Sequence, residues 1–77
     1  MTLHTMHQVD ARGLSCPMPV VRTAQAIKAL TSGDLLEVFA TAPGSVKDMA
    51  AWARTTGNAL VEQTSDGAVY RFVFRRK

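Results

Sequence analysis

The apolar residues of this chain change their spacing along the sequence, from a strand-like to a helix-like period and back again. Alternation at every second position is typical of a β-strand, whereas repeats at i, i+4 and i+7 are typical of one helix face. The predicted strands cover residues 8–10, 35–41, 59–63 and 68–75. A first helix opens within residues 15–19 and ends before Gly33, and a second covers residues 46–55. The order is therefore β-α-β-α-β-β.

Each predicted helix carries one apolar stripe. In the first helix the stripe consists of Val20, Ala24, Ile27 and Thr31. In the second it consists of Val46, Met49, Ala50 and Ala53. Ser45, followed three residues later by Asp48, resembles the N-cap of the second helix, and Gly57 is expected to close that helix.

The last predicted strand has the clearest alternation, and Asp66-Gly67 before it predicts a hairpin turn. Tyr70, Phe72 and Phe74 share one face, whereas Val69, Arg71, Val73 and Arg75 share the other. We interpret the aromatic face as core beneath the helices. Stacking of nucleic-acid bases is the alternative, but it needs basic residues beside the rings, and these lie on the opposite face. Trp52, on the flank of the second helix, is expected to pack against the core, with a partner contact as the alternative.

The length and the order of the elements limit the possible folds. A chain of 77 residues accommodates one domain, residues 1–77, with a thin core. Strands joined through a helix pair in parallel, whereas the last two strands form an antiparallel hairpin. Both helices must bury their stripes, most economically on one face of the sheet. The predicted fold class is α/β: a two-layer sandwich of a four-stranded mixed sheet with two helices packed on one face. Residues 1–6 are expected to be a loose lead-in.

The charge excludes some functions. The net charge is +3, and part of it lies in Arg75-Arg76-Lys77, which we expect to be a solvated tail. This charge is too small to indicate direct nucleic-acid binding.

No apolar run reaches the roughly 18 residues that span a membrane, and Met1-Thr2-Leu3-His4-Thr5 does not resemble a signal peptide. We therefore expect a cytoplasmic protein without a membrane partner.

Cys16 is the only cysteine. A single cysteine excludes an intramolecular disulfide, a CxxC redox pair and a thiolate-rich zinc site. The two histidines, His4 and His7, lie near the start of the chain and cannot be paired with Cys16 from sequence. The sequence indicates no metal site and no bound cofactor.

The position of Cys16 points to a reactive thiolate. It precedes Pro17 where the first helix begins, and a helix N-terminus presents N–H groups and about half a positive charge. Both favour a thiolate. Pro17 and Pro19 each remove an N–H donor, so the helix field must contribute more of the stabilisation, and Arg12 and Arg22 add positive charge if the fold brings them close. An accessible thiolate suits one-step exchange of sulfur, in which it takes the outer sulfur of a partner's persulfide.

Other interpretations of Cys16 stay open at this point. A lone cysteine is more often a small buried hydrophobe, although a turn framed by two prolines is a poor place for core packing. Glutathionylation, or a selenium-handling or thiol-redox role, is a further alternative.

Residues 9–20, Val-Asp-Ala-Arg-Gly-Leu-Ser-Cys-Pro-Met-Pro-Val, resemble the opening of the TusA family of small sulfur carriers, also called SirA-like. The hallmark of the family is Cys-Pro-x-Pro at the start of the first helix, after an Asp-x-x-Gly-x segment. The resemblance continues through residues 33–38, Asp48 and the hairpin at residues 66–72, so it covers nearly the whole chain from Val9 onward.

The resemblance implies the same β-α-β-α-β-β sandwich, with a persulfide carried on Cys16. It implies a cysteine desulfurase or a rhodanese-like protein as sulfur donor, and acceptor proteins serving tRNA thiolation, molybdenum cofactor assembly or sulfur oxidation. The implied site residues are Cys16 as the sulfur carrier, Asp10, Arg12, Gly13, Pro17 and Pro19 as support of its loop, and Arg22 as a contact for the donor. Met18 is either a surface contact beside the sulfur or an apolar residue that caps the helix, and both interpretations stay open.

Two positions depart from the family pattern. Some thiouridine-pathway members have an acidic residue where this chain has Met18, and many relatives have one before the proline of Thr41-Ala42-Pro43. This neutral loop is a candidate docking element, so donor, acceptor and pathway stay open, as does the question whether the protein counts as an enzyme. The alternative function is a non-catalytic regulatory module, or one that binds RNA or protein, in which Cys16 is incidental.

Overall fold

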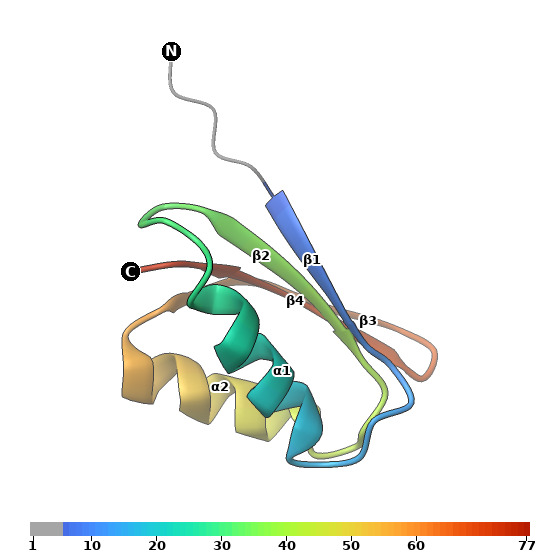
Figure 1. Ribbon diagram of the computed structural model, residues 1–77. Helices are drawn as coiled ribbons and strands as arrows, with labels where there is room; N and C mark the ends of the chain where they lie inside the picture. The colour runs from blue at the N-terminus through green and yellow to red at the C-terminus, as the bar shows by residue number, and fades with distance from the viewer. Residues whose placement is uncertain (1–5) are drawn as a thin grey trace.

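The computed structural model describes residues 6–77. Its elements, in chain order, are β1 (Met6–Ala11), α1 (Met18–Ile27), β2 (Leu35–Ala40), α2 (Ser45–Thr56), β3 (Ala59–Asp66) and β4 (Val69–Arg75). The four strands form one sheet in the order β1-β2-β4-β3, in which β1 is parallel to β2 and the other pairs are antiparallel. Both helices lie on one face of this sheet (Figure 1). The predicted two-layer α/β fold is confirmed.

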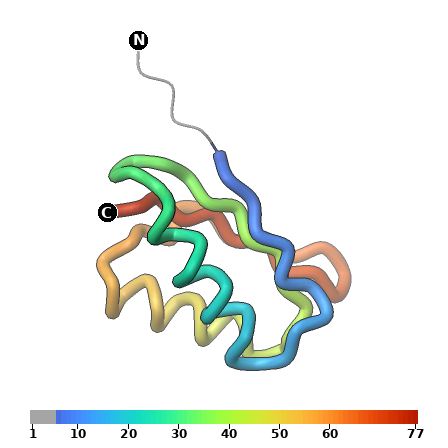
Figure 2. The backbone as a smooth tube through the Cα atoms, viewed as in Figure 1, coloured from blue at the N-terminus to red at the C-terminus, as the bar shows by residue number. Residues whose placement is uncertain are grey.

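The parallel pair decides which loops meet. Since β1 and β2 run in the same direction and each leads into a helix, α1 and α2 both begin at the same end of the sheet (Figure 2). The loops before the two helices are in contact: the Gly13 N–H donates a hydrogen bond to the Thr41 hydroxyl at 2.9 Å. Cys16 lies in the first of these loops.

The core lies between the sheet and the helices. Phe72 and Phe74 are fully buried and stand opposite Val38 and Leu36 of β2. Trp52 of α2 packs edge-on against Phe74, with ring centroids 5.0 Å apart. The prediction that the aromatic stripe and Trp52 pack in the core is confirmed, with Tyr70 half-buried at the margin.

The predicted stripe of α1 is right at Ile27 and at Val20, which packs against the core, and wrong at Thr31. The buried residues of the helix are Pro19, Thr23 and Ile27, whereas Thr31 is exposed. Thr23 can occupy the centre of this face because its hydroxyl donates a hydrogen bond to the Pro19 carbonyl at 2.8 Å. The buried hydroxyl therefore has a hydrogen-bond partner within its own helix. The helix also ends at Ile27, well before Gly33, because the next amides bond three residues back and turn the chain so that Leu30 is buried.

The ends of other elements differ by a few residues. Met6 belongs to β1, so the expected lead-in is wrong at that residue, and residues 1–5 lie outside the described part of the chain. Gly44, not Ser45, is the N-cap of α2; Ser45 is the first helical residue and is buried. Nothing among the described residues explains why the Ser45 hydroxyl has no hydrogen-bond partner. Gly57 closes α2 at φ +82, as predicted.

The sheet face opposite the helices carries its own polar network. The Gln8 amide donates to Glu37 at 2.7 Å, and Arg71 pairs with both Glu37 and Glu62, so the network crosses all four strands. An irregularity in β3 between Leu60 and Glu62 shifts the alternation by one residue and turns Glu62 to the side of Arg71. The hydrogen bond from Arg71 lowers the pKa of Glu37 below its ordinary value, against the effect of burial.

The C-terminal run is not a solvated tail. Arg76 is half-buried; its Nε donates to the Ile27 carbonyl at the end of α1 at 2.8 Å, and its backbone exchanges hydrogen bonds with Gly33 and Asp34. The Lys77 N–H donates to the Asn58 side chain at 2.8 Å. The prediction failed because the acceptor carbonyl belongs to a helix 49 residues earlier in the chain.

We expect Arg76→Met to lower the free energy of unfolding by about 1 kcal/mol, because it removes a charge-assisted hydrogen bond at a helix C-terminus and keeps the aliphatic stem. In a domain of this size such a loss lowers the melting temperature by about 4–8 °C. Arg75→Met, at the exposed neighbouring position, is the matched control and should leave the melting temperature nearly unchanged. Equal effects of the two substitutions would contradict the role of Arg76.

Candidate functional site

Cys16 is exposed and immediately precedes the N-cap of α1, which is Pro17. The chain turns there, since the Met18 N–H donates to the Ser15 carbonyl at 2.9 Å, and the Cys16–Pro17 peptide bond is cis. The interpretation of Cys16 as a buried packing residue is therefore wrong. An exposed sulfur at a helix start is accessible to a second protein.

The first turn of α1 can stabilise an anion on Cys16 through the helix dipole, but it has few free N–H groups to donate hydrogen bonds to that anion. Pro19 has no N–H, and the Val20 and Val21 amides both lie 3.1 Å from the Pro17 carbonyl, to which they donate. Together with the Met18 bond, these contacts use the amide donors at the start of the helix. An anion on Cys16 is thus favoured by the dipole of α1 without a direct N–H contact.

The N-terminus of α2 lies against the same sulfur. A Cβ built on Gly44 would stand 3.2 Å from Cys16 Sγ and 3.6 Å from Asp48 Oδ2. The absence of a side chain at Gly44 lets the sulfur approach the backbone of this helix start. Sequence reasoning missed Gly44; the signal was the Pro43-Gly44 pair before a helix in the second of two parallel strand–helix units.

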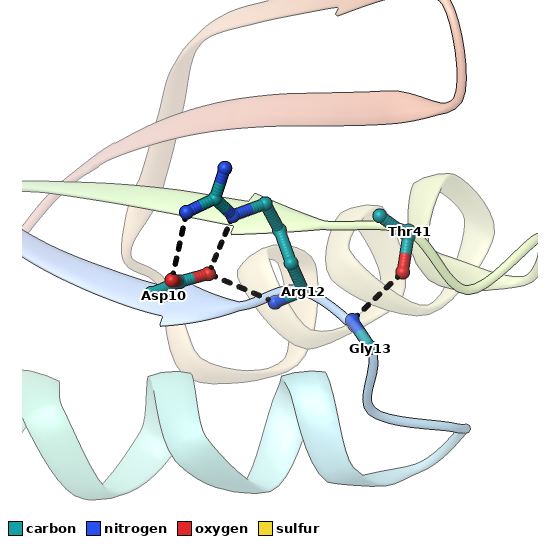
Figure 3. Close-up of polar contacts among 4 residues, drawn as sticks. All are labelled: Asp10, Arg12, Gly13 and Thr41. Atoms are coloured by element: carbon teal, nitrogen blue, oxygen red, sulfur yellow. Dashed lines mark hydrogen bonds and ion pairs between the residues drawn. The ribbon is translucent and has the colours of Figure 1, made fainter.

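Asp10, Arg12 and Gly13 form the turn that leads from β1 toward Cys16. The Arg12 guanidinium binds both carboxylate oxygens of Asp10, at 2.8 and 2.9 Å, and the Arg12 N–H donates to the same carboxylate (Figure 3). Gly13 adopts φ +79, a conformation that favours glycine. The guanidinium lies on the side of β1 away from α1 (Figure 3). Its charge is paired with Asp10, so Arg12 does not supply the positive charge that was expected beside Cys16.

The ion pair predicts an acid titration that can be followed at one residue. Hydrogen bonding to Arg12 lowers the pKa of Asp10 from 3.8 to about 2. Because the folded-state pKa lies below the unfolded one, the pairing persists above pH 4 and is lost as the pH falls toward 2. We expect the Asp10 carboxyl carbon, followed by NMR, to titrate near 2, and its midpoint to rise toward 3.8 in Arg12→Gln. The same midpoint in both proteins would contradict the pairing.

Met18 and Arg22 lie one turn apart on the exposed side of α1. Met18 is 38% exposed and Val21, next to Arg22, is 37% exposed, so an apolar surface borders the sulfur. Arg22 makes no ion pair with any residue of the described chain. These side chains are free to contact a partner.

Two hollows of the surface have linings that do not include Cys16. One, of about 340 Å³, is lined by Gln8, Val9, Asp10, Arg12 and Phe39. Another, of about 350 Å³, is lined by Ile27, Thr56, Asn58, Arg76 and Lys77. Within residues 6–77 the His, Cys, Asp and Glu side chains form no cluster of three that could hold a metal ion. No helix in the same range is long and apolar enough to cross a membrane.

Comparison with known proteins assigns the chain to a family. A family model described as sulfurtransferase TusA matches residues 7–76. YrkI of Bacillus subtilis is 48% identical over 64 residues, which cover 83% of this chain and 85% of that protein. The sulfur carrier protein TusA of Allochromatium vinosum is 44% identical over 69 residues, which cover 90% of this chain and 91% of that protein.

The fold has a solved counterpart. A SirA-like protein from Desulfitobacterium hafniense superposes with a TM-score of 0.78, over 92% of this chain and 96% of the other, at 23% identity. The family model and the relatives together cover nearly all of the described residues, the Cys-Pro-Met-Pro segment at residues 16–19 included. The chain belongs to the TusA family, also called SirA-like.

Proposed function

We propose that the protein is a cytoplasmic sulfur carrier, which accepts a sulfur atom on Cys16 as a persulfide and passes it to another protein. The observation that carries the proposal is an exposed thiol that immediately precedes one helix and lies against the start of another. Membership of the TusA family supports it, as do relatives named sulfur carrier proteins.

The proposed sulfur transfer is an exchange between a thiolate and a persulfide, and it needs no metal ion, nucleotide or oxidant. The Cys16 thiolate attacks the outer sulfur of a donor persulfide, R–S–SH. The donor's S–S bond breaks as a new one forms, and the donor thiolate leaves with the electron pair. The product is Cys16–S–SH, with no net oxidation. In delivery, an acceptor thiolate attacks the outer sulfur of Cys16–S–SH and Cys16 leaves as the thiolate.

The surface around the sulfur suits docking of proteins with an acidic surface. The exposed charged residues of the two helices and of the α1 C-cap are all basic: Arg22 and Lys47 toward the helix starts, and Lys28 and Arg54 toward the helix ends. Met18 and Val21 are exposed apolar residues of α1, and in the sequence they lie between Cys16 and Arg22. We propose a cysteine desulfurase or a rhodanese-like protein as donor. The acceptor would serve tRNA thiolation, molybdenum cofactor assembly or sulfur oxidation, and Thr41-Ala42-Pro43 would contribute to partner choice.

Sulfur transfer can be tested by intact-mass spectrometry. The protein, incubated with a cysteine desulfurase and cysteine, should gain about 32 Da, the mass of one sulfur atom, and lose it on treatment with a thiol reductant. Loaded protein, freed of the desulfurase, should then transfer the sulfur to an acceptor thiol. Absence of the mass gain with both a desulfurase and a small-molecule persulfide would refute the proposal.

A further inference from the structure

The two helix starts next to Cys16 differ in what they offer an anion. The first turn of α1 has its amides bonded or replaced by proline, as described above. In α2, the Ser45 N–H donates to Ala42 and the Asp48 N–H to Gly44, whereas the Val46 and Lys47 amides have no acceptor within residues 6–77. Of the two helix starts, α2 is therefore the one with unbonded backbone donors in its first turn.

Asp48 adds a negative charge at the same place. Its carboxylate oxygen and Cys16 Sγ lie within 4 Å of a single point, the position of a Cβ on Gly44. A carboxylate in the first helical turn is attracted by the N-terminal end of the helix, as an anionic sulfur would be. Asp48 and the sulfur thus compete for one electropositive region, and each raises the energy of negative charge on the other.

We propose that the first turn of α2 sets the reactivity of Cys16, with Gly44 admitting the sulfur to the positive end of the helix and Asp48 acting as a positioning residue whose carboxylate opposes negative charge on that sulfur. The proposal rests on the carrier function proposed above. A carrier thiolate must attack the outer sulfur of the donor persulfide and must later leave, as a thiolate, from its own persulfide. A sulfur that is too strongly stabilised as an anion leaves readily but attacks weakly. Asp48 holds that stabilisation at an intermediate level.

The test measures alkylation of Cys16 by iodoacetamide at pH 7, in which the thiolate displaces iodide from carbon. We expect Asp48→Asn to react about two- to fivefold faster than the unmodified chain, because it removes a nearby carboxylate that repels negative charge on the attacking sulfur. Asp48→Glu, which retains the charge, should react within about twofold of the unmodified chain. Added salt should reduce the difference between the asparagine and aspartate proteins.

A matched control separates the local effect from a change in net charge. Glu62→Gln also removes one carboxylate, but on the opposite face of the sheet, and should leave the alkylation rate unchanged. Gly44→Ala should slow alkylation, because its methyl group would stand 3.2 Å from Sγ and displace the sulfur from the helix end. Since Cys16 is already exposed, loosening of the fold does not reproduce this pair of opposite effects.

The outcomes distinguish this inference from the carrier function. If Asp48→Asn and Glu62→Gln react equally fast, or if Asp48→Asn is slower than the unmodified chain, the role of Asp48 is refuted even when the protein still gains sulfur from a persulfide donor. If Asp48→Asn alone is faster but no variant gains sulfur, the effect on Cys16 stands and the carrier function is refuted.

Discussion

A Cys16→Ser variant is expected to take up no sulfur while keeping its fold. A serine hydroxyl is not ionised at neutral pH and forms no persulfide, so the mass gain of about 32 Da should disappear completely. The side chain is exposed and fills no space in the core, so the melting temperature should stay within about 2 °C of the original. The change therefore removes the chemistry and leaves the structure.

The measurement compares intact masses after incubation with a persulfide donor, beside thermal unfolding of the same samples. Ser15→Ala is the matched control, because it removes a hydroxyl one residue away at an exposed position and keeps the thiol. It should load sulfur as the unmodified chain does. Sulfur bound to the serine variant, at any yield above background, would place the acceptor atom elsewhere and remove the basis of the proposed function.

The order of the elements could be predicted because local residues mark their ends. Gly57 closes α2 as the residue directly after its last turn, and Asp66-Gly67 marks the end of β3 and the start of the tight connection to β4. Tyr70, Phe72 and Phe74 occupy every second position of β4, and this spacing places the three rings on one face without reference to any other element. Such signals act over a few residues, and a reading along the chain detects them.

The features that the sequence did not predict have other origins: Thr23 depends on a contact within its own helix, whereas Arg76 and Glu62 depend on contacts between distant residues. Thr23 is a core residue only because its hydroxyl finds a carbonyl within its own helix, which hydrophobicity does not report. Arg76 is held by the end of α1, and Glu62 faces Arg71 only because β3 contains an irregularity. None of these features has a periodicity that could be counted.

The candidate site divides in the same way. The position of Cys16 before a helix follows from the adjacent prolines, and the Asp10–Arg12 pair spans only two residues. The approach of Gly44 to the sulfur depends on the parallel pairing of β1 and β2, which brings two loops of separate strand–helix units together. Sequence therefore identifies the reacting atom, and the tertiary fold supplies its electrostatic environment.

Phe72→Ala should cost about 3–5 kcal/mol, the range for removing a buried aromatic ring from a core. Phe72 is fully buried, stands opposite Val38 and stacks near Phe74, with ring centroids 6.3 Å apart. A domain of this length has a total stability of roughly 4–11 kcal/mol, so the loss is a large part of it. Urea unfolding followed by far-ultraviolet circular dichroism would measure the change.

Two further variants decide what such a loss means. Phe39→Ala removes the same ring from the adjacent strand, but on the face away from the helices, where Phe39 is half-buried; we expect a cost of about 1–2 kcal/mol. If the alanine variant of Phe72 does not fold, Phe72→Leu still gives a measurable transition, with a loss of about 1–2 kcal/mol. A Phe39→Ala loss as large as that of Phe72→Ala would contradict the placement of the main core between the sheet and the helices.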